Sequence, residues 1–334
     1  MRGSVRHPKN IMASPATYLY IVAGCLFCWV SCCIFSVGFP FREETDTPLL
    51  WNTIYQALPN KQIAYLAGFL LALGGAFLLH RLNYTVMLIR EKNYLPLVLY
   101  LLLTSTNFLF FPLNATSISA FFIIIALYFL FISYHDTFSQ DKIFAMSFSV
   151  GIGSLIWIQI LWFVPLFWYG MYLFKSLNLK TFSASILGLA TVYWFLLGWC
   201  VWSGDYTAFT IPFNTLVQLN LLHFSELYML DFIELTIIFA LALTAIINII
   251  THNYLENLRT RRYLSFLITM TFWSGLLYLL YEQPSEELQQ TAYISAALLL
   301  SHLFTVLHNR VMCYLFYIFT FTLFVLLAYQ VWNF

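Results

Sequence analysis

The chain has 334 residues, of which 61% are hydrophobic, 20% aromatic and only 9% charged, and its net charge is +1. Soluble globular domains carry about 25% charged residues, so this composition excludes a water-soluble domain and predicts a protein embedded in the lipid bilayer. The balanced charge and the absence of a long basic cluster give no sign of nucleic-acid binding.

Apolar runs long enough to cross a bilayer follow one another along the chain, separated by short polar breaks. The run from Ile143 to Phe174 is too long for one helix. We expect two short helices in a tight hairpin, interrupted at Trp162–Pro165, because Pro165 cannot donate a backbone hydrogen bond. The other spans are predicted near Thr17–Val37, Gln62–Arg81, Tyr94–Phe111, Ser117–Tyr134, Phe182–Trp202, Asp231–Thr251, Tyr263–Tyr281, Thr291–His308 and Val311–Trp332. The sequence therefore predicts an all-α, polytopic bundle of about eleven transmembrane helices.

The first apolar run follows basic residues, as in a signal peptide. At about 20 residues it is long enough to span a bilayer, and no small-x-small cleavage site precedes Gly38. We therefore expect it to remain as the first span. No loop is long enough for a separate globular domain, so we expect residues 1–334 to form one integral membrane domain. Its predicted extramembrane parts are a cytoplasmic tail at 1–16, a first outer loop at 38–61 and a second outer loop at 203–230.

The basic residues predict the orientation, because cytoplasmic loops retain Lys and Arg. With the N-terminus inside, only Arg42 and Lys61 fall outside. The inner set is Arg2, Arg6, Lys9, Arg81, Arg90, Lys92, Lys142, Lys175, Lys180, Arg259, Arg261, Arg262 and Arg310. An odd number of spans then places the C-terminus outside.

The first outer loop contains three closely spaced carboxylates, Glu43, Glu44 and Asp46. Carboxylates in this arrangement can hold a divalent cation, or one of them can act as general base on an acceptor hydroxyl. Arg42 and Lys61 flank the same loop and could hold a lipid phosphate. The alternative is an ordinary solvated connection between two spans.

The same loop continues into a short amphipathic stretch that ends near Leu58. Trp51 and Tyr55 are suited to the membrane interface. Thr47 could cap the helix, with Pro48 in its first turn. We therefore predict a helix that lies on the outer membrane surface.

Polar residues are rare inside the predicted spans, and each is costly in lipid. Asn107 and Gln159 fall in the outer half of the membrane, and Asp205 lies in the second outer loop. All three are candidate substrate-binding residues, while hydrogen bonding between helices is the alternative role for the first two.

Small residues within the spans are interpreted as packing positions. These are Cys25, Cys28, Cys32, Cys33, Gly74, Gly75, Gly151 and Gly153. No HExxH, Walker, GxSxG or GxGxxG motif occurs, which argues against a metallohydrolase, an ATPase or a dinucleotide enzyme.

Three segments carry a family resemblance: the runs that begin at Asn93, Phe148 and Leu173, the last ending at Gly188. Through these segments the chain resembles a multi-spanning inner-membrane protein family of Bacteroidota, and the resemblance extends over roughly residues 60 to 330.

The first third is also distantly similar to the C-type glycosyltransferases. These enzymes use polyprenyl-phosphate sugars and have a first span, an acidic outer loop and a juxtamembrane helix. The resemblance implies an inner-membrane enzyme, with Glu43, Glu44 and Asp46 as the acidic positions and a polyprenyl phosphate as the lipid carrier.

Three functions remain open from the sequence. The first is a glycosyltransferase-like protein that acts on a lipid-linked sugar at the outer face of the bacterial inner membrane. The second is a non-catalytic subunit of an envelope complex, and the third is a lipid or solute transporter.

Overall fold

The computed structural model describes residues 15–35, 49–58, 60–89, 93–105, 110–204, 206, 209–210, 213–214, 216, 229–252, 256–280, 285–306 and 310–332. Within these residues the regular elements are all helices, so the predicted all-α class is confirmed for this part of the chain. The elements are α1 (Pro15–Phe35), α2 (Leu49–Gln56), α3 (Lys61–Val86), α4 (Leu95–Thr104), α5 (Ala115–Ile132), α6 (Gln140–Ile156), the 3-10 helix η3 (Ile158–Phe163), α7 (Val164–Leu173), α8 (Leu179–Ser203), α10 (Met229–His252), α11 (Leu258–Leu280), α12 (Ser285–Val306) and α13 (Arg310–Trp332).

Five helices, α1, α3, α5, α8 and α11, are long and apolar enough to cross a membrane. Their apolar segments contain 18 to 26 residues, with a mean hydropathy between 1.5 and 2.4. At about 1.5 Å per residue, 20 residues match the thickness of a hydrocarbon core. Between 22% and 56% of each segment is buried within the protein, so many of the remaining apolar side chains need lipid as their solvent. These are the properties of a helical membrane protein.

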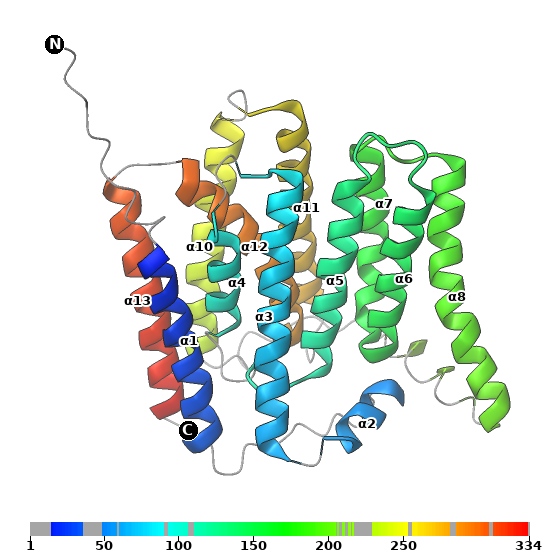
Figure 1. Cartoon of the computed structure of the whole chain (residues 1–334), viewed down its shortest axis with the longest axis horizontal. Helices are drawn as coiled ribbons and strands as arrows, with labels where there is room; N and C mark the ends of the chain where they lie inside the picture. Colours follow the sequence, from blue (N-terminus) through cyan, green and yellow to red (C-terminus); the bar gives the residue numbers. More distant parts are fainter. Residues whose placement is uncertain are drawn as a thin grey trace.

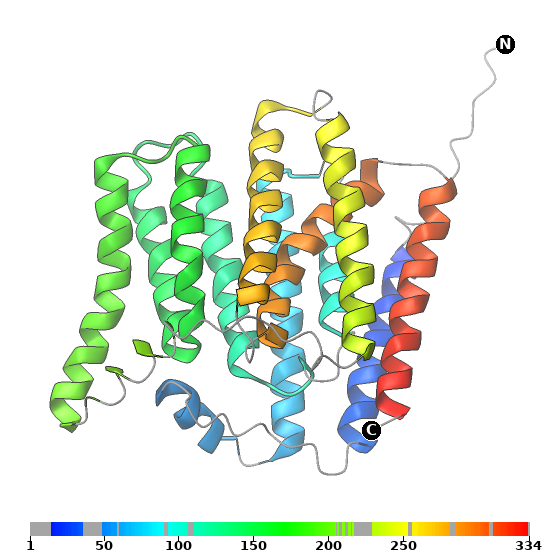
Figure 2. The same cartoon turned by 180° about the vertical axis from the view of Figure 1, so that it is seen from behind.

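Apart from the short α2 and η3, consecutive helices from α1 to α13 run in alternating directions (Figures 1 and 2). The short α2 lies across one end of the bundle, where α1 ends and α3 begins (Figure 1). At this α2 end, α1, α3, α8 and α13 extend further than α4, α11 and α12 (Figures 1 and 2). At the α2 end, the central helices α4, α11 and α12 therefore stop short of the outer helices.

The central helix is α12, which packs against α11, α4, α10 and α5 and crosses the bundle obliquely (Figures 1 and 2). On one side of this core, α6 is packed between α5 and α8. On the other side, α1 and α13 lie side by side at the edge of the bundle. The central helix α12 is thus formed by residues near the C-terminal end of the sequence.

The sequence predicted an interruption at Trp162–Pro165, and the structure places it earlier, directly after Ile156. Helix α6 ends at Ile156, and Trp157 has extended backbone angles (φ −143°, ψ 105°). The turn η3 follows, and α7 begins at Val164 with Pro165 in its first turn. A proline is tolerated there because the first amides of a helix have no partner within the helix. Pro165 therefore starts the second helix, while the chain leaves the first helix at Trp157.

The glycines expected to pack closely do so. A Cβ atom on Gly151 would lie 2.8 Å from Val192 Cγ2, and one on Gly153 would lie 2.7 Å from Ile160 Cδ1. The contacts at Gly74 and Gly75 are looser, at 3.3 Å and 3.1 Å. The closest approach is one that the sequence did not reveal: a Cβ atom on Gly68 would lie 2.4 Å from a backbone carbonyl oxygen of the α4–α5 connection.

Candidate functional site

Most of the site residues predicted from the sequence lie outside the described residues. These are Arg42, Glu43, Glu44, Asp46, Asn107 and Asp205, together with the predicted capping residues Thr47 and Pro48. The structure describes the other two candidates, Lys61 and Gln159, and the helix that follows the acidic loop.

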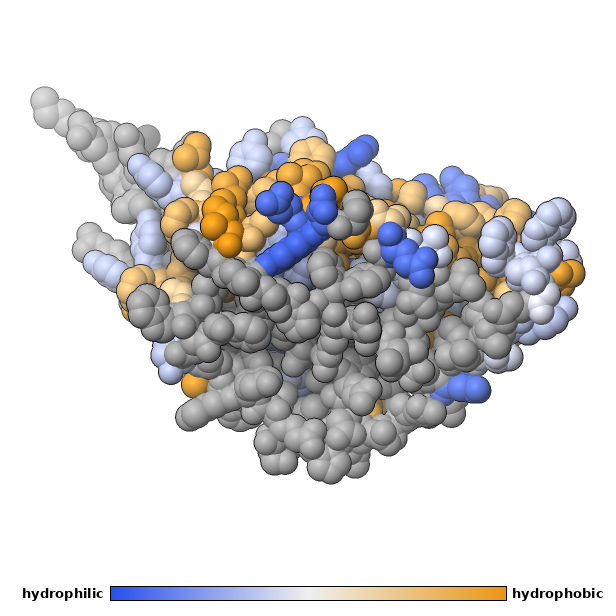
Figure 3. Space-filling model, turned by 90° about the horizontal axis from the view of Figure 1, so that it is seen from below, coloured by the Kyte–Doolittle hydropathy of each residue, from blue (hydrophilic) through white to orange (hydrophobic). Residues whose placement is uncertain are grey.

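That helix, α2, forms where the amphipathic pattern predicted it. It packs against α6, and the Trp51 side chain is only 6% exposed. Figure 3 looks onto this end of the molecule and shows hydrophilic side chains scattered among hydrophobic ones. The sequence placed Trp51 in the interface, whereas the structure buries its ring in the hydrophobic core that α6 shares.

Lys61 is the first residue of α3 and is half-buried at the α2 end. Its ammonium group lies 5.8 Å from the centre of the Tyr65 ring. The unpaired amides at the start of a helix carry partial positive charge, so the ammonium group and the helix end both favour an anion. This end of α3 can therefore attract a phosphate or a carboxylate.

Gln159 lies in η3, at the turn between α6 and α7, and its side chain is half-buried. The chain thus turns at Gln159, before the expected interruption at Trp162–Pro165. The turn that contains Gln159 lies at the same end of the bundle as α2 (Figure 1).

The main polar feature of the described core is α12, which the sequence reasoning missed. From Leu288 to Thr305, every residue of α12 is buried except the half-buried Ala292. The buried polar side chains are Gln289, Gln290, Thr291, Ser295, Ser301, His302 and Thr305. The sequence predicts that α12 crosses the membrane, and polar groups within such a helix are often functional. The signal in the sequence was this density of polar residues within one predicted span.

One polar face of α12 is paired with α11 and with the connection before it. Ser295 Oγ accepts a hydrogen bond from Thr271 Oγ1 at 2.9 Å. Nearer the opposite end, His302 Nε2 lies 3.7 Å from a carboxylate oxygen of Glu256, and both side chains are nearly inaccessible. These contacts give this face of the helix a structural role.

The other polar face begins near the α2 end of the bundle. Gln289 Nε2 donates to Tyr293 Oη at 2.5 Å, and the Tyr293 ring meets Phe110 edge-on, with ring centres 6.0 Å apart. The side chain of Gln290 is 3% exposed, and its oxygen Oε1 has no hydrogen-bond partner among the described residues.

Phe110 belongs to an irregular segment that follows α4. Helix α4 has only 10 residues, and its C-cap Ser105 accepts a hydrogen bond from Trp29 Nε1 at 3.0 Å. Phe110 is buried, and Leu113 donates its amide to the carbonyl oxygen of Ala64 at 3.0 Å. Irregular backbone at membrane depth occurs only where protein or a water-filled cavity surrounds it, and it often forms binding sites.

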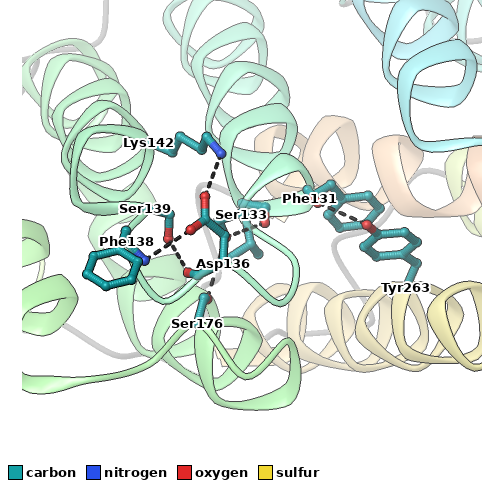
Figure 4. Close-up of polar contacts among 9 residues, drawn as sticks. Phe131, Ser133, Asp136, Phe138, Ser139, Lys142, Ser176 and Tyr263 are labelled. Carbon is teal, nitrogen blue, oxygen red and sulfur yellow. Dashed lines mark hydrogen bonds and ion pairs between the residues drawn. The ribbon is translucent and has the colours of Figure 1, made fainter.

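The opposite end of the bundle contains a network that stabilises the connections between helices (Figure 4). Asp136 accepts hydrogen bonds from Lys142 Nζ at 2.8 Å and from the amide of Phe138 at 3.0 Å. Both hydrogen bonds lower the pKa of the Asp136 carboxyl below its usual value, and the bond from Lys142 has the larger effect. Both ionic groups are about one-third exposed, and their contacts close the turn before α6. We therefore assign this network a structural role.

Two cysteines of the described residues, Cys25 and Cys32, are buried in α1. Their interpretation as packing residues agrees with the contacts that Cys32 makes in a small core cluster with Trp29, Tyr65 and Phe111. Among the described residues, no group of three or more His, Cys, Asp or Glu side chains could hold a metal ion.

Comparisons with protein-family models, with curated proteins and with solved structures found no match to this chain.

Proposed function

We propose that this chain is a glycosyltransferase-like enzyme of the bacterial inner membrane that acts on a lipid-linked sugar at the outer face. The observation that carries the proposal is α2, which packs beneath α6 at the end of the bundle where α1 ends and α3 begins. An acidic segment between a first span and such a surface helix is the arrangement that the C-type glycosyltransferases also have.

The proposed topology has eleven membrane-crossing helices, a cytoplasmic N-terminus and an extracytoplasmic C-terminus. It is supported by the alternating directions of the consecutive helices other than α2 and η3 and by the distribution of positive charge. Lys61 begins α3 at the α2 end. The described basic residues at or near the opposite end are Arg81, Lys142, Lys175, Lys180, Arg259, Arg261, Arg262 and Arg310. The α2 end therefore faces away from the cytoplasm in this proposal.

The chemistry that we propose is transfer of a sugar from a polyprenyl phosphate to an acceptor hydroxyl. The acceptor oxygen forms a bond to the anomeric carbon, the bond from this carbon to the phosphate oxygen breaks, and polyprenyl phosphate leaves. Asp46 or Glu44 takes the proton of the acceptor hydroxyl as general base, and Glu43 adds negative charge to the same loop. Arg42 and Lys61 stabilise the charge that develops on the phosphate.

The test is transfer of a radiolabelled sugar from decaprenyl-phosphate glucose in membranes that contain the overproduced protein. Asp46→Asn keeps the shape of the side chain but removes the base, so we expect transfer to be lost while the protein is produced and purified normally. Asp141→Asn is the matched control, because this exposed carboxylate lies in the first turn of α6 at the opposite end. Wild-type transfer by Asp46→Asn would remove the proposed mechanism.

A transporter is the second candidate, and the polar residues along α12 favour it. They extend from Gln289 near the α2 end to Thr305 near the opposite end, and all are buried. A carrier needs polar groups at successive depths of the membrane. Proteoliposomes distinguish the two functions: an enzyme consumes the sugar lipid on one side, whereas a carrier moves it intact to the other leaflet.

A further inference from the structure

The amide of Gln290 is a buried polar group that the proposed mechanism does not use. Its side chain is 3% exposed, and Oε1 has no hydrogen-bond partner among the described residues. A buried acceptor without a donor loses the hydrogen bonds that water would give it, and in lipid no water compensates for this loss. An apolar residue of the same size would avoid this loss, so an unsatisfied amide at this position indicates a functional role.

The surroundings of Gln290 combine amide and aromatic groups from two segments distant in sequence. Tyr293 lies one turn further along α12, on the same side of the helix as Gln290. Its hydroxyl accepts the hydrogen bond from Gln289, and its ring contacts Phe110 of the irregular segment after α4. A few fixed polar groups among aromatic rings are the usual lining of a small-molecule site.

Gln290 is also placed within reach of the α2 end. It lies five residues after Ser285, the first residue of α12, which corresponds to about 8 Å along the helix axis. Helix α12 begins at the end of the bundle that carries α2, where the central helices stop short of the outer ones (Figures 1 and 2).

We propose that Gln290 forms the floor of a buried subsite for a group that donates a hydrogen bond, and that this group is a sugar hydroxyl. An amide oxygen accepts hydrogen bonds, and an ionised phosphate oxygen also only accepts. The phosphate of a lipid therefore cannot satisfy Oε1, whereas a sugar hydroxyl can. The identification of the donor as the sugar of a lipid-linked substrate rests on the proposed function.

The test uses Gln290→Met, which keeps the length of the side chain and removes the amide. The matched control is Thr291→Val. Thr291 is also fully buried, but its hydroxyl donates to the Leu288 carbonyl oxygen of its own helix, at 2.7 Å. Each protein is purified in lauryldimethylamine oxide, which has no sugar head group. The midpoint of thermal unfolding is then measured against increasing decaprenyl-phosphate glucose, and separately against decaprenyl phosphate.

We expect the wild type and Thr291→Val to bind the glucose-bearing lipid about tenfold more tightly than the bare phosphate, which corresponds to one buried hydrogen bond. Gln290→Met should bind the two lipids equally. Without lipid it should unfold at the same temperature as the wild type or higher, because the unsatisfied acceptor is gone.

The other outcomes separate the subsite from the proposed function. If Gln290→Met still prefers the glucose-bearing lipid, or if it unfolds at a lower temperature without lipid, the amide has a structural role and the subsite is wrong. A wild type that binds both lipids equally also overturns the subsite, while recognition of a lipid phosphate stands. A wild type that binds neither lipid contradicts the proposed function, and the subsite with it.

Discussion

Replacing Gly68 with Ala tests how the irregular segment after α4 is packed in the bundle. A Cβ atom on Gly68 would lie 2.4 Å from the Phe111 carbonyl oxygen and 3.0 Å from the Leu113 amide nitrogen. Ordinary contacts begin at 3.4 Å, and the atoms in the way are backbone atoms, which cannot rotate aside. The segment must therefore move by about 1 Å, a rearrangement of the kind that overpacking produces.

The expected magnitude follows from this displacement. The Leu113 amide donates to Ala64 at 3.0 Å, and a shift of about 1 Å breaks this bond at a cost of about 1 kcal/mol. Overpacking adds about 1–3 kcal/mol, and the higher helix propensity of Ala returns at most about 1 kcal/mol. We expect a net destabilisation of about 1–3 kcal/mol and an unfolding midpoint lower by several degrees.

The assay uses the cysteines of the chain itself. Cys25, Cys32 and Cys200 are buried, so a maleimide dye that fluoresces on reaction with thiols reports unfolding in detergent. The control is Gly275→Ala in α11, where a Cβ atom would have no neighbour within 4 Å, and we expect it to be neutral or slightly stabilising. Equal midpoints for Gly68→Ala and Gly275→Ala would refute the packing that we describe.

Two further predictions concern the ends of the bundle. Asp136→Asn should be slightly less stable than the wild type at pH 7, by less than about 1 kcal/mol because the pair with Lys142 is partly exposed. The pKa of Asp136 is lower in the folded protein than its ordinary value of 3.8. The difference in stability should therefore persist as the pH is lowered to 3.8, and should disappear only as the pH falls further, through the folded pKa. A difference in stability that already disappears between pH 7 and pH 5 would contradict the assignment. The orientation can be tested with an impermeant maleimide, applied to cells with a permeabilised outer membrane. It should label Thr53→Cys in α2 in these cells, but should label Phe138→Cys only after lysis. The wild type is the control for labelling of the native thiols. The reverse pattern would place the N-terminus outside.

Much of the fold could be predicted from the sequence because lipid imposes simple rules. Every apolar run of sufficient length must form a helix, since unpaired backbone groups are too costly in the bilayer. The ends of α5, α8 and α13 accordingly lie within a few residues of the polar breaks that predicted them. The short helix α2 was also predictable from its amphipathic pattern, although Trp51, which was expected at the interface, is buried in the core.

The interior was harder to predict, because helix packing in membranes leaves little trace in hydropathy. Nothing in the sequence showed that α12 is the central helix, or that α4 ends after 10 residues. The polar residues of α12 were visible, but their importance depends on burial from all sides, which only the packing reveals. The break at Trp157 was missed because no proline or glycine marks it in the sequence.

The candidate site also contains residues that the sequence predicted and one that it did not. The acidic loop was noticed because charge is rare in this chain, yet its carboxylates lie outside the described residues. Lys61 and Gln159 are both described at the α2 end, where the sequence placed them. The amide of Gln290 was not predicted, since an unpaired acceptor is a property of its three-dimensional surroundings.

The most direct test of the proposed function is mass spectrometry of the lipids that remain bound after gentle purification. The wild type is compared with Arg42→Ala/Lys61→Ala, and with Lys180→Ala/Arg262→Ala, which removes two exposed basic residues at the opposite end. The account predicts that a polyprenyl phosphate or its sugar adduct copurifies with the wild type and with the second variant, and is lost from the first. Ordinary phospholipid alone in all three proteins would contradict it.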